Sequence, residues 1–376
     1  MEARFEYNEE RMLSNLMEMI RIDSESGKEG EMTAWLEKWF AAHGFETVRD
    51  NAGSTCGSTG DNLIVHIPGT MEGEAIAFNA HQDTVKPAIG IEPVIEGRRM
   101  VSKGDTILGA DDKSGIAVLL EILENLTEKN IPHREMYYFF SIGEEVGMYG
   151  AKALDPAMLP CKNFFHLDDA GQVGIFRTGG PGAYKMHCEF TGKAAHAGIE
   201  PEKGVSAVQM LAEAVMNMPL GRIDEETTAN VGVIGGGQAT NIVTEHTRFD
   251  AEARSRNAEK LENQVAAMKK ACLDAAEKFG GKADFTASYE YPPLKVDFDS
   301  FLARCCLDAY EKEGVEVVRI PSGGGGDCNI LAGKGYVCGG ISTAMYGPHT
   351  LGEYLDLDEL AVCYRVVMRM MTDGFK

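Results

Sequence analysis

The sequence predicts an α/β fold in which a large domain, built on a central mixed sheet flanked by helices, is interrupted by a smaller α+β domain. Apolar runs of strand length alternate with helical patterns at both ends of the chain. Several of these runs end in His, Asp or Glu, where the strands of an open parallel sheet present ligand-binding side chains. From about Tyr184 the pattern changes to longer alternating strands and two amphipathic helices, which marks the inserted domain.

The composition narrows the class of protein. The chain of 376 residues has room for two domains, and its 44% hydrophobic and 25% charged residues are typical of globular proteins. A net charge of -22 argues against nucleic acids and anionic membranes as partners and suits metal cations. No apolar run approaches the ~20 residues of a membrane span. Nine cysteines without metal-ligand or disulfide spacing, and no cleavable signal at residues 1–5, predict a cytoplasmic location.

The first elements carry no chemical signal. Helical spacing of apolar residues predicts one helix over Asn8–Ile22 and a second that ends at Gly44. Short apolar runs predict strands over Glu46–Arg49 and Asn62–Ile67. These elements are expected to contribute to the hydrophobic core.

The next predicted strand, Ala75–Ala80, is the first to be followed by candidate catalytic or metal-binding residues, in the segment His81-Gln82-Asp83. Positions i and i+2 of an extended chain share one side. His81 could bind a metal while Asp83 accepts a hydrogen bond from its other ring nitrogen or fixes a neighbouring group. Taken alone, a structural histidine is the more common explanation of this motif.

Two aspartates stand at the start of the next helix, within Leu108–Gly115. Asp111 and Asp112 could simply cap the helix and interact favourably with its dipole. Alternatively, Asp111 bridges two cations with its two carboxylate oxygens. Both interpretations fit this segment alone.

Adjacent carboxylates follow the strand Met136–Phe140, in Gly143-Glu144-Glu145-Val146-Gly147. Two neighbouring acids repel each other unless a cation lies between them or they share a proton. A solvated acidic turn is the more common explanation of a lone Glu-Glu pair. Further along, the run Asn163–Leu167 leads to Asp168, and His349 follows another predicted strand.

Together these segments supply oxygen and imidazole ligands without any cysteine, a set that suits Zn, Mn or Co. The five candidate ligands are His81, Asp111, Glu145, Asp168 and His349. A bridging Asp with one His and one carboxylate on each side describes a two-metal site, in which ions ~3.5–4 Å apart activate water and polarise a carbonyl. Glu144 is then free to act as a general base.

The ordered motifs HxD, GADDKSG, GEEVG, LDDAG and PHT resemble the dinuclear metallopeptidases that include peptidase T, carboxypeptidase G and aminoacylases. The resemblance covers nearly the whole chain and is strongest to peptidase T-like enzymes over residues 130–152. It implies a catalytic domain of the zinc-exopeptidase type, with two divalent ions, most often Zn, and a cis peptide between the two aspartates. In this arrangement His81 and Asp168 bind one ion, Glu145 and His349 the other, Asp111 bridges, Asp83 is the accessory acid and Glu144 the base.

One position departs from the family pattern. Asp169-Ala170 follows the last aspartate ligand, where peptidase T itself favours glycines. This difference predicts a peptidase T-like relative and leaves the preference for tripeptides open.

The inserted domain is predicted at residues 181–292, between catalytic segments 1–180 and 293–376. Its elements follow a β-α-β-β-α-β order, which indicates a small antiparallel sheet with two helices on one face. The expected elements are Tyr184–Phe190, Val205–Met218, Thr228–Val233, Thr247–Ala253, Ala258–Phe279 and Asp284–Tyr291. The resemblance implies that this domain is a lid and the surface of a homodimer.

Substrate contacts are expected from three places. His196 lies in a glycine-flanked turn and could be an ordinary surface histidine, but the resemblance implies contact with substrate or its oxyanion. Arg254 could grip a carboxylate bidentately, and Asn241 lies in the preceding loop. A glycine run containing Gly324 and Gly325 is either a flexible turn or an anion-binding nest.

The resulting functional hypothesis is a metallo-exopeptidase that releases N-terminal residues from short peptides. An N-acyl amino acid deacylase or a carboxypeptidase is the alternative within the same family. A non-catalytic, metal-dependent binding protein is the alternative of another class, and the intact Glu144 argues against it.

Overall fold

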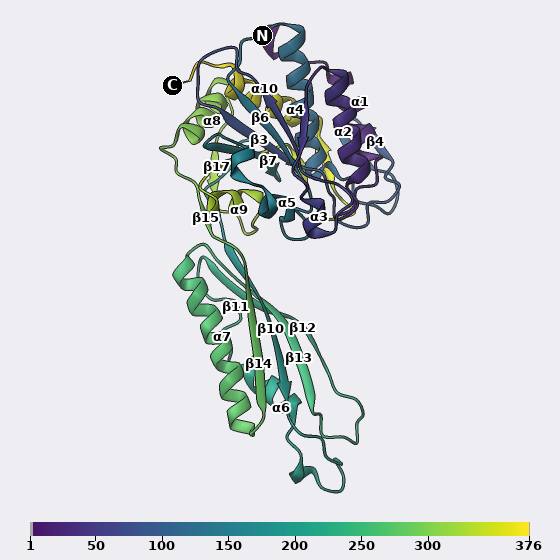
Figure 1. The fold of residues 1–376 in the computed structure, drawn as a ribbon, viewed down its shortest axis with the longest axis vertical. Coiled ribbons are helices and arrows are strands. Elements are labelled where there is room, and N and C mark those ends of the chain that lie inside the picture. Colours follow the sequence, from purple (N-terminus) through teal and green to yellow (C-terminus); the bar gives the residue numbers. More distant parts are fainter. Residues whose placement is uncertain (1–2, 376) are drawn as a thin grey trace. The chain divides into compact units, whose positions relative to one another are not determined.

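The computed structural model describes residues 3–375 and divides into two compact units, whose elements are labelled in Figure 1. The first comprises Met1–Thr178, Val296–Pro321 and Gly326–Lys376. The second comprises Gly179–Lys295 and the loop Ser322–Gly325. We had expected that glycine loop in the catalytic domain, but it packs with the inserted unit.

Two contacts attach the glycine loop to the second unit. The backbone N–H of Ser322 donates to the carbonyl of Gly179 at 2.8 Å. Gly325 lies against the ring of Tyr291 so closely that a Cβ atom there would meet the ring at 2.3 Å. Only glycine fits at this position, because a methyl group would require the aromatic ring to move.

A six-stranded mixed sheet forms the centre of the first unit, in the order β1-β2-β6-β3-β7-β17. Strands β6, β3, β7 and β17 run parallel, whereas β2 is antiparallel to β6 and β1 to β2. The strands span Thr47–Arg49 (β1), Leu63–Ile67 (β2), Ile76–His81 (β3), Met136–Ser141 (β6), Asn163–Asp169 (β7) and Val337–Ser342 (β17). The predicted central mixed sheet is therefore confirmed.

Helices cover the sheet. The longer ones are α1 (Glu9–Ile20), α2 (Gly30–Ala42), α4 (Ala110–Glu128), α8 (Phe301–Lys312) and α10 (Leu357–Thr372). Short helices are α3 (Gly53–Cys56), α5 (Tyr149–Ala153) and α9 (Asp327–Gly333), with 3₁₀ turns η1 (Ala3–Phe5) and η2 (Pro156–Met158). Helix α4 packs on β3 and β7 and contacts α1 and α10, while α9 packs on β7 and β17.

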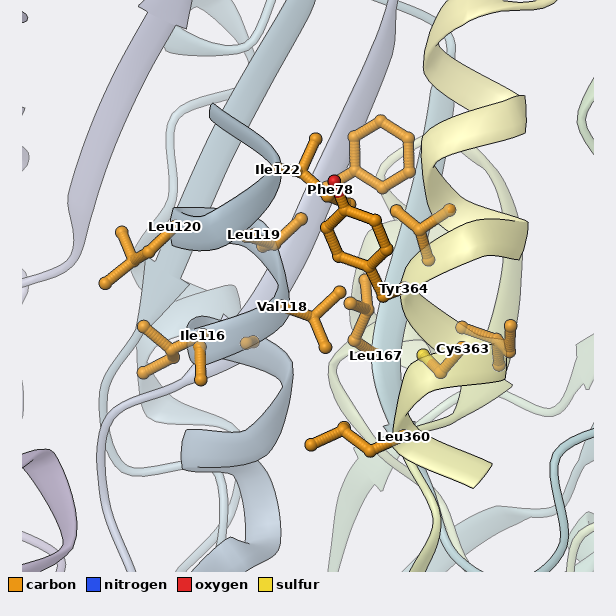
Figure 2. Packing of buried hydrophobic residues seen from close by; sticks show 14 of the residues in the cluster. Phe78, Ile116, Val118, Leu119, Leu120, Ile122, Leu167, Leu360, Cys363 and Tyr364 are labelled. Carbon is orange, nitrogen blue, oxygen red and sulfur yellow. The ribbon is translucent and has the colours of Figure 1, made fainter. Parts of the chain in front are cut away.

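The packing between α4 and α10 fixes the start of α4, where Asp111 lies. Val118 and Leu119 of α4 face Tyr364 of α10 in Figure 2, with Phe78 and Leu167 of the sheet beside them, and all five are fully buried. Each such side chain contributes roughly 1.5–3 kcal/mol of burial free energy. The helix is thus a firmly packed support for Asp111 and Asp112, which lie at its start in non-helical backbone conformations.

Most short strands of this unit were not predicted; the exception is β16, which lies within the strand expected at Val315–Ile320. A four-stranded sheet, β18-β19-β5-β4, and the parallel pair β16-β8 lie outside the main sheet. Their bounds are Pro93–Glu96 (β4), Arg99–Ser102 (β5), Ile175–Arg177 (β8), Val318–Ile320 (β16), Met345–Tyr346 (β18) and Tyr354–Asp356 (β19). These strands have at most four residues and are partly exposed, so they lack the apolar run that marks a buried strand.

The second unit is a five-stranded antiparallel sheet, β11-β12-β13-β10-β14, with helices α6 and α7 against it. The strands are β10 (Gly182–Thr191), β11 (Gly221–Arg222), β12 (Thr227–Gly236), β13 (His246–Ser255) and β14 (Lys282–Tyr291). The helices are α6 (Ala207–Asn217), α7 (Ala258–Phe279) and the turn η3 (Pro201–Lys203), and a separate pair joins β9 (Gly179–Gly180) to β15 (Leu294–Lys295). The predicted β-α-β-β-α-β order is confirmed, with β11 as an addition.

Alternation along the strands builds the core of this unit. Phe249, Ala251 and Ala253 of β13 are buried, as their period of two predicts, and they join Phe190 and Met268 in one hydrophobic cluster.

Within residues 3–375, no helix is both long enough and apolar enough to cross a bilayer.

Candidate active site

The parallel strands bring the predicted site residues to one edge of the main sheet. His81 is the last residue of β3, and it pairs in register with Ser141 at the end of β6. Asp168 lies near the end of β7, the neighbour of β3 on its other side. Because the carboxyl ends of parallel strands meet at one edge, side chains far apart in sequence converge there.

Asp111 lies at the centre of the cluster. One carboxylate oxygen, Oδ1, is 3.0 Å from Nε2 of His81, and the other, Oδ2, is 3.2 Å from Nε2 of His349. His349 also lies 2.9 Å from Oε1 of Glu145, and His81 lies 3.7 Å from Oδ1 of Asp168. The peptide between Asp111 and Asp112 is cis. Each oxygen of Asp111 thus faces a different histidine, and each histidine has a second carboxylate beside it.

Asp83 orients both His81 and the glutamate loop. The ring Nδ1 of His81 is 2.9 Å from the backbone carbonyl of Asp83 and 3.5 Å from its carboxylate. That carboxylate accepts hydrogen bonds from the backbone N–H groups of Glu144 at 3.0 Å and Glu145 at 3.3 Å, and from the hydroxyl of Ser26 at 2.7 Å. Of the two roles considered for Asp83, fixing a neighbouring group accounts for more of its contacts.

Glu144 lies beside the cluster. Ligand atoms of Glu144, His81 and Asp168 lie within 4.8 Å of one another. Burial, together with the charge of Asp168, raises the pKa of Glu144 well above its usual range. A Cβ at Gly326 would lie 3.3 Å from the Glu144 carboxylate, so the backbone of Gly326 forms a close wall of the site. A carboxyl with a raised pKa is suited to accept and return a proton near neutral pH.

The electrostatics of the cluster favour a divalent cation. Burial and the charge of Asp111 raise the pKa of Asp168 to about 7. Hydrogen bonds to Asp111 and Glu145 raise the pKa of His349 to about 10. Protons thus bind tightly where carboxylates crowd together, and a metal ion bound to the same atoms would relieve the same repulsion. A second group of ligand atoms, from His81, Asp111 and Glu145, also lies within 4.8 Å, and this donor set fits zinc, manganese or cobalt.

One buried acid near the site was not predicted. Asp327, at the start of α9, accepts a hydrogen bond from the hydroxyl of Ser141 at the end of β6. Burial raises its pKa to about 6, and its charge is among those that raise the pKa of Glu144. The only sequence signal is its position directly after the glycine run, for which a flexible turn and an anion-binding nest were the two interpretations.

Two predicted substrate-binding residues meet in the second unit. His196 and Ile242 form an isolated β-bridge, and the N–H of Ala197 donates to the carbonyl of Asn241 at 2.9 Å. His196 is exposed, and its Nδ1 accepts a hydrogen bond from the N–H of Gly198 at 3.2 Å.

Arg254 and the glycine loop also share a region of the second unit. Arg254 and Tyr291 both pair with Ala183 of the strand between them, and Gly325 packs against the Tyr291 ring. The guanidinium of Arg254 already forms a bidentate pair with Glu252, at 3.1 and 2.9 Å. We had not foreseen this pair, because residues i and i+2 of a strand share one face but need not bond.

Comparison with known proteins identifies the family. A model described as peptidase dimerisation domain matches residues 178–279, and one described as peptidase family M28 matches residues 62–195. A crystal structure of the aminopeptidase PepT from Bacillus cereus is 41% identical, with a TM-score of 0.92 over 97% of this chain and 98% of that one. A tripeptidase from Staphylococcus aureus is 34% identical, with a TM-score of 0.94 over the same shares. The chain belongs to the peptidase T-like metallopeptidases.

Membership of this peptidase T-like family agrees with the geometry. The uncharacterized protein YqjE of Bacillus subtilis is 38% identical over 98% of this chain and all of that protein, so the family pattern extends from end to end. The predicted family, the predicted fold and the predicted class of metal-dependent exopeptidase are therefore confirmed. As a peptidase T-like enzyme, the protein is a hydrolase of peptide bonds.

Proposed function

We propose that this enzyme is an aminopeptidase that removes the N-terminal residue of tripeptides and other short peptides. It uses two divalent ions, zinc in the first place and manganese or cobalt as alternatives. The observation that carries the proposal is the Asp111 carboxylate, whose two oxygens face His81 and His349 at 3.0 and 3.2 Å. A carboxylate shared in this way suits a pair of metal ions better than a single ion.

Each residue of the cluster has a role in this mechanism. His81 and Asp168 would hold one ion, Glu145 and His349 the other, and Asp111 both. The ions would supply a water of lowered pKa and polarise the scissile carbonyl. Glu144 takes a proton from the attacking water and passes it to the departing amine, as its raised pKa permits. Asp83 keeps His81 and the Glu144 backbone in place.

The inserted unit binds the free carboxylate of the substrate in this proposal. Arg254 and the N–H groups of the glycine loop, including Gly324 and Gly325, offer donors to an anion, and Asn241 offers an amide. His196 helps to stabilise the oxyanion of the reacting carbonyl. In a tripeptide cut at its first bond, the anchored carboxylate lies two residues beyond that bond, which selects for short peptides.

Amidation of the C-terminus of a tripeptide should lower kcat/KM by a factor that corresponds to about 2 kcal/mol of transition-state stabilisation. This is the contribution of a hydrogen bond to a charged group. Arg254→Ala should lower kcat/KM for the free acid far more than for the amide. The matched control is Arg248→Ala, which removes a guanidinium from the same strand and face. Equal cleavage of the acid and amide by the wild type, with Arg254→Ala affecting both alike, would contradict carboxylate anchoring.

We also propose a homodimer formed by the inserted unit. Beyond its short pairing with β11, strand β12 has no neighbour on its outer side among the described residues of this unit. Val233 and Ile234 on that strand, and Met216 on α6, are large apolar side chains left 54%, 58% and 83% exposed. A second copy could pair with this edge and cover these side chains.

Mixing experiments test whether His196 acts in the partner's site. Glu144→Gln and His196→Ala should each be nearly inactive alone. Their heterodimers contain one site with both groups intact, so random mixing should restore about a quarter of wild-type activity. His187→Ala, which alters another histidine of the same unit, should be active alone. A fully active protein that sediments as a monomer would contradict both the homodimer and the role of His196 in the partner's site.

A panel of free and blocked peptides separates the alternatives within the family. An aminopeptidase needs a free N-terminus, whereas a deacylase or carboxypeptidase tolerates N-acetylation. A binding protein would hydrolyse none of the panel, with or without a chelator.

We further propose that the enzyme works in the cytoplasm, since all nine cysteines are free thiols, as expected in a reducing compartment.

A further inference from the structure

The carboxylate of Glu353 holds the backbone segment that leads into Asp111. One oxygen accepts hydrogen bonds from the N–H groups of Leu108 and Gly109 at 2.8 and 2.9 Å. The other accepts from the N–H groups of Ala110 and Asp111 at 2.8 and 3.2 Å. Glu353 is 2% exposed, so water cannot replace these bonds. Four consecutive N–H groups, from Leu108 in the preceding loop to Asp111 in α4, therefore depend on one side chain.

The same residue ends the turn that carries His349. The N–H of Glu353 donates to the carbonyl of Thr350 at 3.1 Å, and the Thr350 hydroxyl donates to the carbonyl of Gly347 at 2.7 Å. These bonds make residues 347–353 a compact unit. The side chain of His349 is 52% exposed, and within residues 3–375 its polar contacts are with Asp111 and Glu145. Its position therefore depends largely on how the turn is anchored.

Charge makes this arrangement specific for a carboxylate. A buried carboxylate is stable here because four backbone N–H groups donate hydrogen bonds to its two oxygens. Lys113 of the same helix is fully buried and interacts electrostatically with Glu353. An amide of the same shape has one accepting oxygen, and its NH₂ group would face two of the four donors. Replacing Glu353 with Gln should therefore loosen the segment without removing volume.

We propose that Glu353 is a positioning residue, which fixes Asp111 and His349 relative to one another so that both can bind the same metal ion. The inference rests on the proposed two-metal function and adds a residue that contacts neither substrate nor metal. Outer residues that orient ligands typically change metal affinity about 10–100-fold when they are replaced. Glu353 acts on two ligands at once, through their backbone.

The test measures Co²⁺ binding to metal-free protein by calorimetry and by the visible absorption of the bound ion. Glu353→Gln should weaken at least one of the two equivalents about 10–100-fold and should change the absorption spectrum. Glu121→Gln is the matched control, because Glu121 is a fully buried acid of α4 that accepts from the N–H of Asn8 at 2.8 Å and from Arg11 at 2.7 Å. It should lower the melting temperature and leave Co²⁺ affinity unchanged.

Glu353→Asp keeps the charge on a shorter arm and provides a second variant should the Gln form not fold. Its affinity should lie between those of the wild type and Glu353→Gln. Wild-type affinity and spectrum in a folded Glu353 variant, or equal losses of affinity in Glu121→Gln, would overturn the positioning role. A wild-type protein that binds no Co²⁺ would instead refute the proposed function, so the two failures are distinguishable.

Discussion

Glu144→Gln should lower kcat at least a hundredfold, the usual loss on removal of a general base, while metal content and KM change little. The amide has the shape of the carboxyl but cannot accept a proton from water or return one to the leaving amine. The effect should be confined to turnover, because Glu144 is held through its backbone N–H by Asp83 and not through its carboxylate. Steady-state kinetics on a tripeptide, with metal content measured on the same sample, checks this expectation.

A second variant, Glu144→Asp, tests whether the position of the proton acceptor matters as well as its presence. It keeps a proton acceptor but withdraws it by one methylene from the wall at Gly326, so its kcat should fall between those of the wild type and Glu144→Gln. Near-normal turnover in Glu144→Gln would assign the base to another group. Asp327 would then be the next candidate, because it is buried close by and burial raises its pKa to about 6.

Asp111→Asn should reduce kcat/KM roughly a thousandfold, since metal ions contribute several kcal/mol of transition-state stabilisation. The substitution removes the charge that both ions would share and turns one of the two oxygens, now facing His81 and His349, into an NH₂ group. Unlike Glu144→Gln, it should also lower metal affinity. Added metal should restore part of the activity.

Asp112→Asn is the neighbouring control. Asp112 is fully buried, and its carboxylate accepts from the backbone N–H of His81 at 3.3 Å. Burial, with the charge of Asp168, raises its pKa well above the usual range, so a neutral amide resembles its protonated form. A loss of kcat/KM as large as that of Asp111→Asn would mean that activity depends on the conformation of this segment rather than on a carboxylate shared by two ions.

The large elements were predictable because their apolar patterns are strong. The 22 residues of α7 have the same bounds in sequence and structure, since Asn257 caps the start and Gly280 the end. The strands β4 and β5 were missed because they are short and half-exposed. The glycine loop was assigned to the wrong unit because its neighbour, Tyr291, lies more than thirty residues earlier and no local pattern links them.

The cluster was predictable where a candidate ligand lies at or just beyond the end of a strand, as His81 and Glu145 do. Their convergence required only that parallel strands end at one edge. Supporting residues could not be found in this way. Glu353 and Asp327 act through backbone groups and hydroxyls of distant segments, so their roles depend on packing that appears only in three dimensions. The pairing of Arg254 with Glu252 was not predicted for a different reason, since residues i and i+2 of a strand share one face but need not bond.

The central claim is that Asp111 lies between two metal ions. It is tested most directly by elemental analysis of wild-type protein and Asp111→Asn, each reconstituted with Zn²⁺ and freed of excess metal. The wild type should hold two equivalents per chain, and Asp111→Asn should hold clearly fewer, with Asp112→Asn close to the wild type. One equivalent or none in the wild type, or two retained in Asp111→Asn, would contradict the two-metal site.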